Sequence, residues 1–182
     1  FYAPIKANSS HIHFAFITGI TKLSQLSIFS TINNLTNISM DPEFSTICGI
    51  TKDELDTVLK EDIALLASKN HVSFERMREL LRENYDGYHF SREGEDIFNP
   101  YSLMRSFAAG FIDNYWYASG TSTYLIHQMQ HFHTDVTTLD DMFAFSSSFD
   151  RPTEKMSDAL PLLYQSGYLT IKKYDPLSNG YY

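Results

Sequence analysis

The stretch Phe14-Ala-Phe-Ile-Thr-Gly-Ile-Thr-Lys22 decides how the fold of this chain is interpreted. It is an apolar run that ends in glycine, small polar residues and one cation. Buried strands of α/β sheets are continuous apolar runs, and such sheets bind ligands at the carboxyl ends of their strands. The stretch therefore predicts a buried strand over residues 12–18 that brings Thr18, Thr21 and Lys22 to a ligand-binding edge.

The composition predicts a folded protein with an apolar core. The chain has 182 residues, of which 43% are hydrophobic and 15% aromatic, enough for one large domain or two small ones. Its formal net charge of -8 argues against a broad surface for nucleic acid or anionic membranes, and nucleic-acid binding is not indicated. No apolar run is long enough to span a bilayer. With one cysteine and no signal peptide, we expect a cytoplasmic protein.

The two ends of the sequence favour a piece of a longer protein. The chain begins with Phe1 rather than methionine, and it stops two residues after a turn at Asn179–Gly180. A hairpin whose return strand has two residues is an unusual natural terminus. We therefore expect further sequence around this chain.

Most of the chain after residue 45 has helical patterns. Thr51 and Glu54 form a capping box, and Asn99-Pro100 is a strong helix start because Asn caps well and Pro suits the first helical position. Apolar residues then recur at helical spacing. The expected helices cover residues 52–69, 73–87, 100–109, 121–131 and 160–167, and a short helical piece is expected at 139–143 within a long connection over 133–156.

Short strands and turns separate these helices. We expect a small hairpin that pairs Tyr88–Phe90 with Asp96–Phe98, and further short strands at residues 24–30 and 37–40. Near the end of the chain, Gly167 stops a helix, a strand is expected at 168–174, and a turn follows at 175–180. Helix, glycine, strand, turn and strand is the order found at the end of a winged helix.

The block Asn84-Tyr-Asp-Gly-Tyr-His-Phe90 has two interpretations. In the functional one, the titratable groups of Asp86 and His89 contact a nucleotide or a partner. In the structural one, Gly87 ends a helix with a positive φ, Asp86 bonds the turn, and Tyr88 and Phe90 pack on one face of a strand. The residue types favour the structural interpretation.

Histidines provide a rival hypothesis of a metal-dependent hydrolase. His127 and His131 are four apart on an expected helix with His133 nearby, and His11 and His13 are two apart on a strand. Such spacings can hold a transition metal, but the H-E-x-x-H pattern is absent. The alternative is that these histidines lie on the surface without a functional role, and we therefore predict no metal site.

Other titratable groups give weaker signals. Cys48 is expected to be a buried apolar residue rather than a nucleophile, since no histidine motif accompanies it. Glu93, Glu95 and Asp96 lie in an expected turn, and Asp140-Asp141 are expected to start a helix. The spacing of a nuclease of the PD-D/E-x-K type is missing, also around Glu154-Lys155. We therefore expect no nuclease within this chain.

Sequence blocks along nearly the whole chain carry a more specific signal. They are Phe14–Lys22, Leu26–Ser30, Asn33–Leu35, Asn37–Ser39, Ile47–Thr51, Asn84–Phe90, Asn99–Ser102, Asn114–Trp116 and Leu162–Ile171. In this order they resemble the AAA-ATPase-like family of prokaryotic proteins. That family joins an N-terminal P-loop ATPase-like module to, commonly, a C-terminal nuclease domain of the PD-D/E-x-K superfamily.

The resemblance implies an α+β, predominantly helical fold in three parts. Residues 1–45 would be the last strand or strands of a P-loop-type α/β core, 46–156 a helical lid with a small hairpin, and 157–182 the truncated start of a winged-helix-like element. Thr18 would be a sensor-like catalytic residue, and Thr18, Thr21 and Lys22 would bind the cofactor. The residues that it marks as structural motif positions are Tyr85, Asp86, Gly87, Tyr88, Asn99, Pro100 and Gly167.

The cofactors and partners implied by the resemblance belong to the full-length parent. They are ATP and magnesium, the remainder of the ATPase core, and a downstream nuclease-like domain. The chain itself contains no G-x-x-x-x-G-K-S/T loop and no apolar strand ending in an acidic pair for magnesium, so we expect it to be inactive alone. A helical interaction module of a pseudo-ATPase is the main alternative. A sheet without its neighbouring strands also predicts self-association through an exposed edge.

Overall fold

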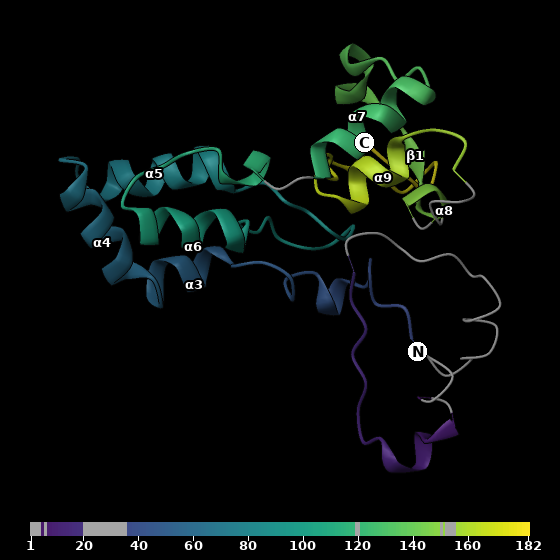
Figure 1. The fold of residues 1–182 in the computed structure, drawn as a ribbon, viewed down its shortest axis with the longest axis horizontal. Helices are drawn as coiled ribbons and strands as arrows, with labels where there is room; N and C mark the ends of the chain where they lie inside the picture. Colours follow the sequence, from purple (N-terminus) through teal and green to yellow (C-terminus); the bar gives the residue numbers. More distant parts are fainter. Residues whose placement is uncertain (1–4, 6, 20–35, 119–120, 150, 152–155) are drawn as a thin grey trace. The chain divides into compact units, whose positions relative to one another are not determined.

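The computed structural model describes residues 5, 7–19, 36–118, 121–149, 151 and 156–182. This part of the chain is an α+β fold that is mostly helical (Figure 1). No helix in it is both long enough and apolar enough to cross a membrane. The chain divides into two compact units. Unit 1 consists of Phe1–Asn37, Leu125–Leu169 and Tyr174–Tyr182, and unit 2 of Ile38–Tyr124 and Thr170–Lys173.

Unit 2 is a helical unit with one apolar core. Its elements are η2 (Pro42–Phe44), α3 (Lys52–Thr57), α4 (Lys60–Lys69), α5 (Phe74–Tyr85), α6 (Pro100–Ala109) and η3 (Tyr115–Ala118). Helix α4 packs against both α5 and α6. The buried core residues are Leu55, Ile63, Leu66, Ala67, Met77, Leu81, Tyr85, Phe98 and Leu103. The helical patterns of the sequence thus converge on a single core.

The predicted single helix over residues 52–69 is wrong, because the chain forms two helices. The capping box is confirmed: the Glu54 main-chain N–H donates to the Thr51 hydroxyl at 3.2 Å, and the Thr51 N–H donates to the Glu54 carboxylate at 2.9 Å. The break follows α3 at Val58 and Leu59. The Thr57 hydroxyl donates to the Asp53 carbonyl at 2.6 Å, and such back-bonding bends helices.

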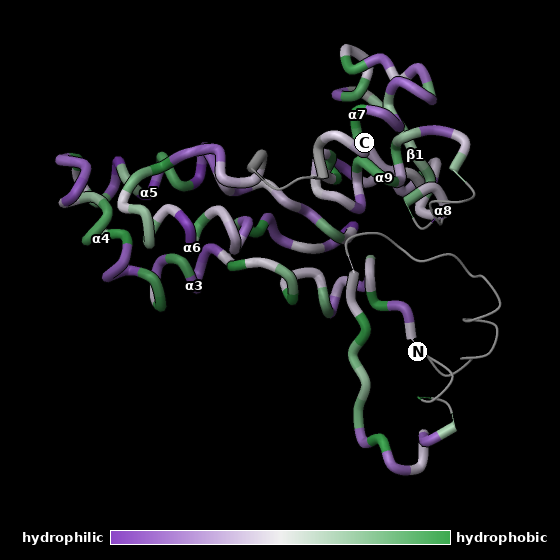
Figure 2. Tube along the Cα trace, in the orientation of Figure 1, coloured by the Kyte–Doolittle hydropathy of each residue, from purple (hydrophilic) through white to green (hydrophobic). Residues whose placement is uncertain are grey.

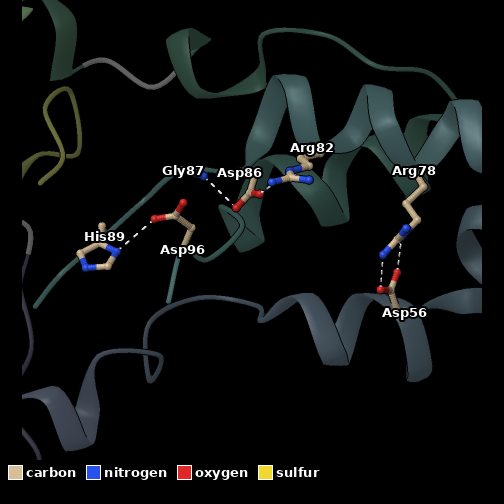
Figure 3. Close-up of polar contacts among 7 residues, drawn as sticks. All are labelled: Asp56, Arg78, Arg82, Asp86, Gly87, His89 and Asp96. Atoms are coloured by element: carbon tan, nitrogen blue, oxygen red, sulfur yellow. Dashed lines mark hydrogen bonds and ion pairs between the residues drawn. The ribbon is translucent and has the colours of Figure 1, made fainter. Parts of the chain in front are cut away.

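Helices α5 and α6 begin and end where the sequence signals lie. The Ser73 hydroxyl accepts the Arg76 N–H at 3.1 Å, and the Asn99 side chain accepts the Ser102 N–H at 2.9 Å. Gly110 follows α6 with a φ of 85°. Arg78 of α5 forms a two-pronged ion pair with Asp56 of α3, in which Arg78 Nε lies 2.5 Å from Asp56 Oδ1 (Figure 3).

Unit 1 contains a small sheet and short helices. Its elements are η1 (Ser9–His11), most of α7 (Thr121–His131), η4 (Val136–Asp141), β1 (Ala144–Phe145), α8 (Ser146–Phe149), α9 (Leu160–Gln165), β2 (Tyr174–Asp175) and β3 (Gly180–Tyr181). The sheet is antiparallel in the order β1-β3-β2, with Tyr181 opposite both Ala144 and Tyr174. The Gln165 side chain donates to the Phe149 carbonyl at 2.8 Å and so ties α9 to α8.

Several short strands differ from the prediction. Residues 168–173 are outside any strand, so the strand expected at 168–174 is reduced to Tyr174–Asp175. Residues 37–40 form no strand, and the expected strand at 24–30 lies outside the described residues. Within 133–156, the helical piece expected at 139–143 is replaced by η4, and β1 and α8 follow. The division at residues 45 and 156 stays a prediction.

The predicted buried strand at residues 12–18 is wrong in this structure. The segment from Ile12 to Gly19 has no regular secondary structure and is exposed throughout. The side chains of Phe14 and Phe16 are 78% and 52% exposed, and Figure 2 shows the apolar character of this extended trace. A buried central strand needs neighbours on both edges, and the strands that the structure describes all belong to the C-terminal sheet.

The capping box makes the stability of the chain depend on pH. Hydrogen bonds from the main-chain N–H and the hydroxyl of Thr51 lower the pKa of Glu54. The stabilisation is therefore complete above the unfolded pKa of about 4.3 and is lost as the pH falls through the lower folded pKa. We expect Glu54→Gln to flatten the acid branch of the free energy of unfolding against pH, measured by urea denaturation. The exposed Glu61 in the first turn of α4 provides the control Glu61→Gln. Equal acid branches in the wild type and Glu54→Gln would contradict the prediction.

Candidate functional site

The candidate site is the turn that follows α5, from Tyr85 to Phe90. Helix α5 ends at Tyr85 because Asp86 is extended, with φ −86° and ψ 167°, and Gly87 has a φ of 105°. The Asp86 carboxylate accepts the Gly87 N–H at 2.8 Å, and its second oxygen lies 3.4 Å from Arg82 Nε (Figure 3). The predicted roles of Asp86 in the turn and Gly87 at the helix end are confirmed.

Tyr85 joins three segments of unit 2. Its carbonyl accepts the Asn99 N–H at 2.9 Å, which places the start of α6 beside the end of α5. Its hydroxyl donates to the Asp113 carbonyl at 2.9 Å and accepts the Asp113 N–H at 3.0 Å. The side chain is buried in the core, and this burial raises the pKa of Tyr85. Tyr85 therefore has a structural role, because it links the end of α5 to the start of α6 and to the loop at Asp113.

The expected hairpin is reduced to a single bridge, in which Tyr88 and Ile97 exchange two main-chain hydrogen bonds of 3.3 and 2.9 Å. Phe98 pairs instead with Ile50, which precedes α3, through hydrogen bonds of 2.8 and 3.2 Å. The rings of Tyr88 and Phe90 are stacked with centroids 6.3 Å apart, as expected for residues two apart on a strand. The structural interpretation of this block is confirmed at each of these contacts.

His89 and Asp96 form the polar pair of the site. His89 Nδ1 lies 3.0 Å from Asp96 Oδ1, and the exposed fractions of the two side chains are 18% and 61% (Figure 3). The main-chain N–H of His89 also donates to the Thr170 hydroxyl at 2.6 Å, and this hydroxyl donates to the main-chain carbonyl of His89 at 3.3 Å. A carboxylate that holds one ring nitrogen fixes the orientation of an imidazole for proton transfer or binding.

Sequence reasoning missed the partners of this turn. Thr170 lies 81 residues from His89, and Asp113 lies 28 residues from Tyr85. Neither contact involves a motif, because Asp113 contributes its main chain and Thr170 a common hydroxyl. The one sequence signal that this segment packs against the rest of the unit is the apolar residue Ile171 beside Thr170. In the structure, Ile171 is 4% exposed.

Of the residues predicted to sense a nucleotide, the structure describes only Thr18. Thr18 is exposed and lies at the end of the extended segment, while Thr21 and Lys22 lie outside the described residues. Gly167 follows α9 with a φ of 78°, as expected for a helix stop. The structure therefore brings together Tyr85, Asp86, Gly87 and Tyr88 with Asn99-Pro100, but it assembles no site around Thr18 from the described residues.

The other candidate groups do not gather into a site. His11, His13, His127, His131 and His133 are exposed, and no group of three or more His, Cys, Asp or Glu that could hold a metal occurs in the described part of the chain.

Two of the weaker predictions are wrong. Cys48 is exposed in the turn after η2 instead of being buried. Asp140-Asp141 lie at the end of η4, whose start is capped by Asp135 instead. The Thr137 hydroxyl and N–H, at 2.7 and 2.9 Å from the Asp135 carboxylate, lower the pKa of Asp135. Glu154-Lys155 lie outside the described residues.

Comparison with known proteins finds that the chain is similar to a protein of uncharacterised function. The chain is 30% identical over 170 residues to the "Uncharacterized protein in vnfD 5'region" of Azotobacter chroococcum mcd 1. The match covers 93% of this chain and 31% of the relative, so the chain spans about a third of the relative's length. No protein-family model and no solved structure matches the chain.

Gly87 provides the sharpest test of the structural role of the turn. A methyl group built on Gly87 meets no atom within 4 Å, so a substitution is opposed by the φ of 105° rather than by crowding. We expect Gly87→Ala to lower the free energy of unfolding by about 1–3 kcal/mol, as measured by urea denaturation. Gly87→Asn should cost less, because Asn tolerates positive φ better than Ala. Unchanged stability in Gly87→Ala would contradict this account of the turn.

Proposed function

We propose that this chain is the nucleotide-sensing and lid region of an AAA-ATPase-like protein. The observation that carries the proposal is the segment Ile12–Thr18, which is extended, apolar and uncovered, and which ends in a hydroxyl group. It is joined to a helical unit suited to be a lid. The order of the sequence blocks named above supplies the family resemblance.

The exposed segment has the chemistry of a strand that lacks neighbours. Ile12, Phe14 and Phe16 recur every second residue, and Ile12 and Ile17 are each 37% exposed. Within the part of the chain that the structure describes, the main chain of residues 13–19 forms no hydrogen bond. Apolar surface and unpaired peptide groups both favour association with another sheet. In the proposal, the remainder of the ATPase core supplies that sheet.

Thr18 takes its proposed role from its place at the end of this segment. Phosphoryl transfer depends on positioning and charge stabilisation, and a hydroxyl at a strand end beside the phosphates can orient the terminal phosphate or its attacking water. ATP and magnesium would be held by the phosphate loop and acidic strand of the remaining core, since neither motif occurs in this chain. Thr18, Thr21 and Lys22 would face the nucleotide. The role requires the segment to leave its exposed position and join a sheet.

The C-terminal elements support a winged-helix-like piece, which in this proposal begins with α7, earlier than the residue 157 expected from the sequence. Apart from the 3-10 helix η4 between α7 and β1, they follow one another as α7, β1, α8, α9, β2 and β3, and the sheet order is β1-β3-β2. This is the order of a helix, a strand, two helices and a two-stranded wing that pairs with the first strand. In the proposal this piece leads toward a downstream nuclease-like domain.

Nucleotide assays on the full-length protein that contains this chain test the proposal. We expect the 182-residue chain alone to bind no ATP in titration calorimetry with magnesium, and the full-length protein to bind and hydrolyse it. Thr18→Ala should lower kcat about 10-fold or more while ATP still binds, because a positioning hydroxyl acts mainly in the transition state. The exposed Thr123 of α7 provides the control Thr123→Ala. Unchanged hydrolysis in Thr18→Ala would refute the sensor role, and absence of ATP binding by the full-length protein would favour the interaction module of a pseudo-ATPase.

The uncovered segment also predicts association of the chain when it is purified alone. We expect the mass measured by light scattering to rise with concentration, and Phe14→Asp together with Phe16→Asp to abolish that rise. Leu177→Asp is the matched control, since Leu177 is 97% exposed as a single apolar residue in the turn between β2 and β3. A constant monomer mass for the wild type, or an equal effect of the control, would contradict association through this segment.

A further inference from the structure

The outer face of α6 has an unusual composition for a helix exposed to water. Tyr101, Met104, Arg105 and Ala108 are exposed, whereas Ser102, Leu103 and Ser106 are buried. The exposed residues have the spacing i, i+3, i+4 and i+7, so they lie along one side of the helix. Tyr101 is 50% exposed and Met104 42%. One side of α6 thus offers aromatic, thioether and methyl groups to solvent.

Helix α5 of the same unit shows the ordinary pattern. Its exposed face carries alternating charges, and Arg76 Nη1 lies 3.1 Å from both Glu79 and Glu83. Helix α6 contains no carboxylate and no lysine. Tyr, Met, Phe and Arg are the residues enriched in protein interfaces, where Glu and Lys are depleted. The contrast between two neighbouring helices indicates that the outer side of α6 is a contact surface rather than a solvated face.

Arg105 lies at the centre of this surface. Its guanidinium carbon is 5.9 Å from the ring centre of Tyr115, and the ring of the half-exposed Phe111 is 6.2 Å from the same ring. The arginines Arg76, Arg78, Arg82 and Arg92 each lie within 4 Å of a carboxylate of their own unit. Arg105 instead contacts an aromatic face, so among the described residues its charge stays open to a carboxylate from outside.

We propose that the α6 face, formed by Tyr101, Met104, Arg105, Ala108, Phe111 and Tyr115, binds an amphipathic helix of a partner protein that carries an Asp or Glu at the centre of its apolar side. Apolar side chains of the partner would cover Tyr101 and Met104, and its carboxylate would pair with Arg105 in the two-pronged geometry that guanidinium favours. The small Ala108 allows close approach of a helix. The proposal is independent of nucleotide binding.

A second copy of this chain fits the α6 face poorly. In a symmetric pair of copies, each residue contacts a different residue of the other copy, and only residues at the two-fold axis meet their own counterparts. Because Arg105 is central in the patch, the two guanidinium groups would approach each other without a carboxylate on either helix to separate them. Charge complementarity at Arg105 therefore favours a partner that carries a carboxylate at this position over self-pairing.

The test uses the whole chain and two synthetic helical peptides of about 15 residues, the length at which isolated helices become stable. Both have leucines along one side, and they differ at the central position of that side, which is Glu in the first and Lys in the second. Binding is followed by the methyl signal of Met104 in an NMR titration. We expect the Glu peptide to bind at least about 10-fold more tightly than the Lys peptide, with the largest shift at Met104.

Charge reversal provides the control. Arg105→Glu should invert the preference between the two peptides, Arg105→Lys should keep its direction, and Lys60→Glu, at an exposed position in α4, should leave it unchanged. Equal binding of both peptides, binding that leaves Met104 unshifted, or no binding at all would overturn the proposal. A Met104 signal that shifts with protein concentration alone, also in the variant with Phe14→Asp and Phe16→Asp, would overturn it in favour of a second copy.

Discussion

The helical unit depends on the hydrogen bonds around Tyr85. Tyr85 is the last residue of α5, and its carbonyl accepts the main-chain N–H of Asn99, which caps α6. Its hydroxyl holds the loop after α6 by bonding both the main-chain carbonyl and the main-chain N–H of Asp113. A buried hydroxyl without these partners would lose the compensation for its desolvation. The turn residues that follow can therefore be understood as the means of leaving α5 at an angle that keeps Tyr85 in place. The hydrogen bonds of Tyr85 therefore constrain the turn residues that follow it in the block Asn84–Phe90.

Local signals in the sequence predict local structure well, and contacts between distant segments less well. The caps at Thr51 and Asn99 and the positive φ of Gly87 follow from side-chain chemistry within a few residues. The break between α3 and α4 lies beside a hydrogen bond from the Thr57 hydroxyl to the Asp53 carbonyl, which helix propensity alone does not reveal. The Thr170 contact with His89 depends on the folding of segments 81 residues apart. No pattern in the sequence predicts this contact.

The functional signals separate in the same way. The block after α5 contains titratable groups, yet its geometry is that of a turn whose polar atoms bond within unit 2, both to neighbouring residues and to Asp113 and Thr170. The apolar segment before Thr18 has the composition of a buried strand but lies exposed, because burial of a strand is decided by its neighbours and not by its own residues. The outer side of α6 gave no sequence signal, since a run of Tyr, Met and Ala at helical spacing is equally typical of a core helix.

The functional account depends on the segment Ile12–Thr18 gaining neighbouring strands. Amide hydrogen exchange measures this directly, because peptide groups paired in a sheet exchange slowly and solvated ones exchange fast. We expect residues 13–18 to exchange rapidly in the 182-residue chain at concentrations where it is monomeric, and to be protected in the full-length protein, with α5 equally protected in both. Rapid exchange of residues 13–18 in the full-length protein would contradict the account.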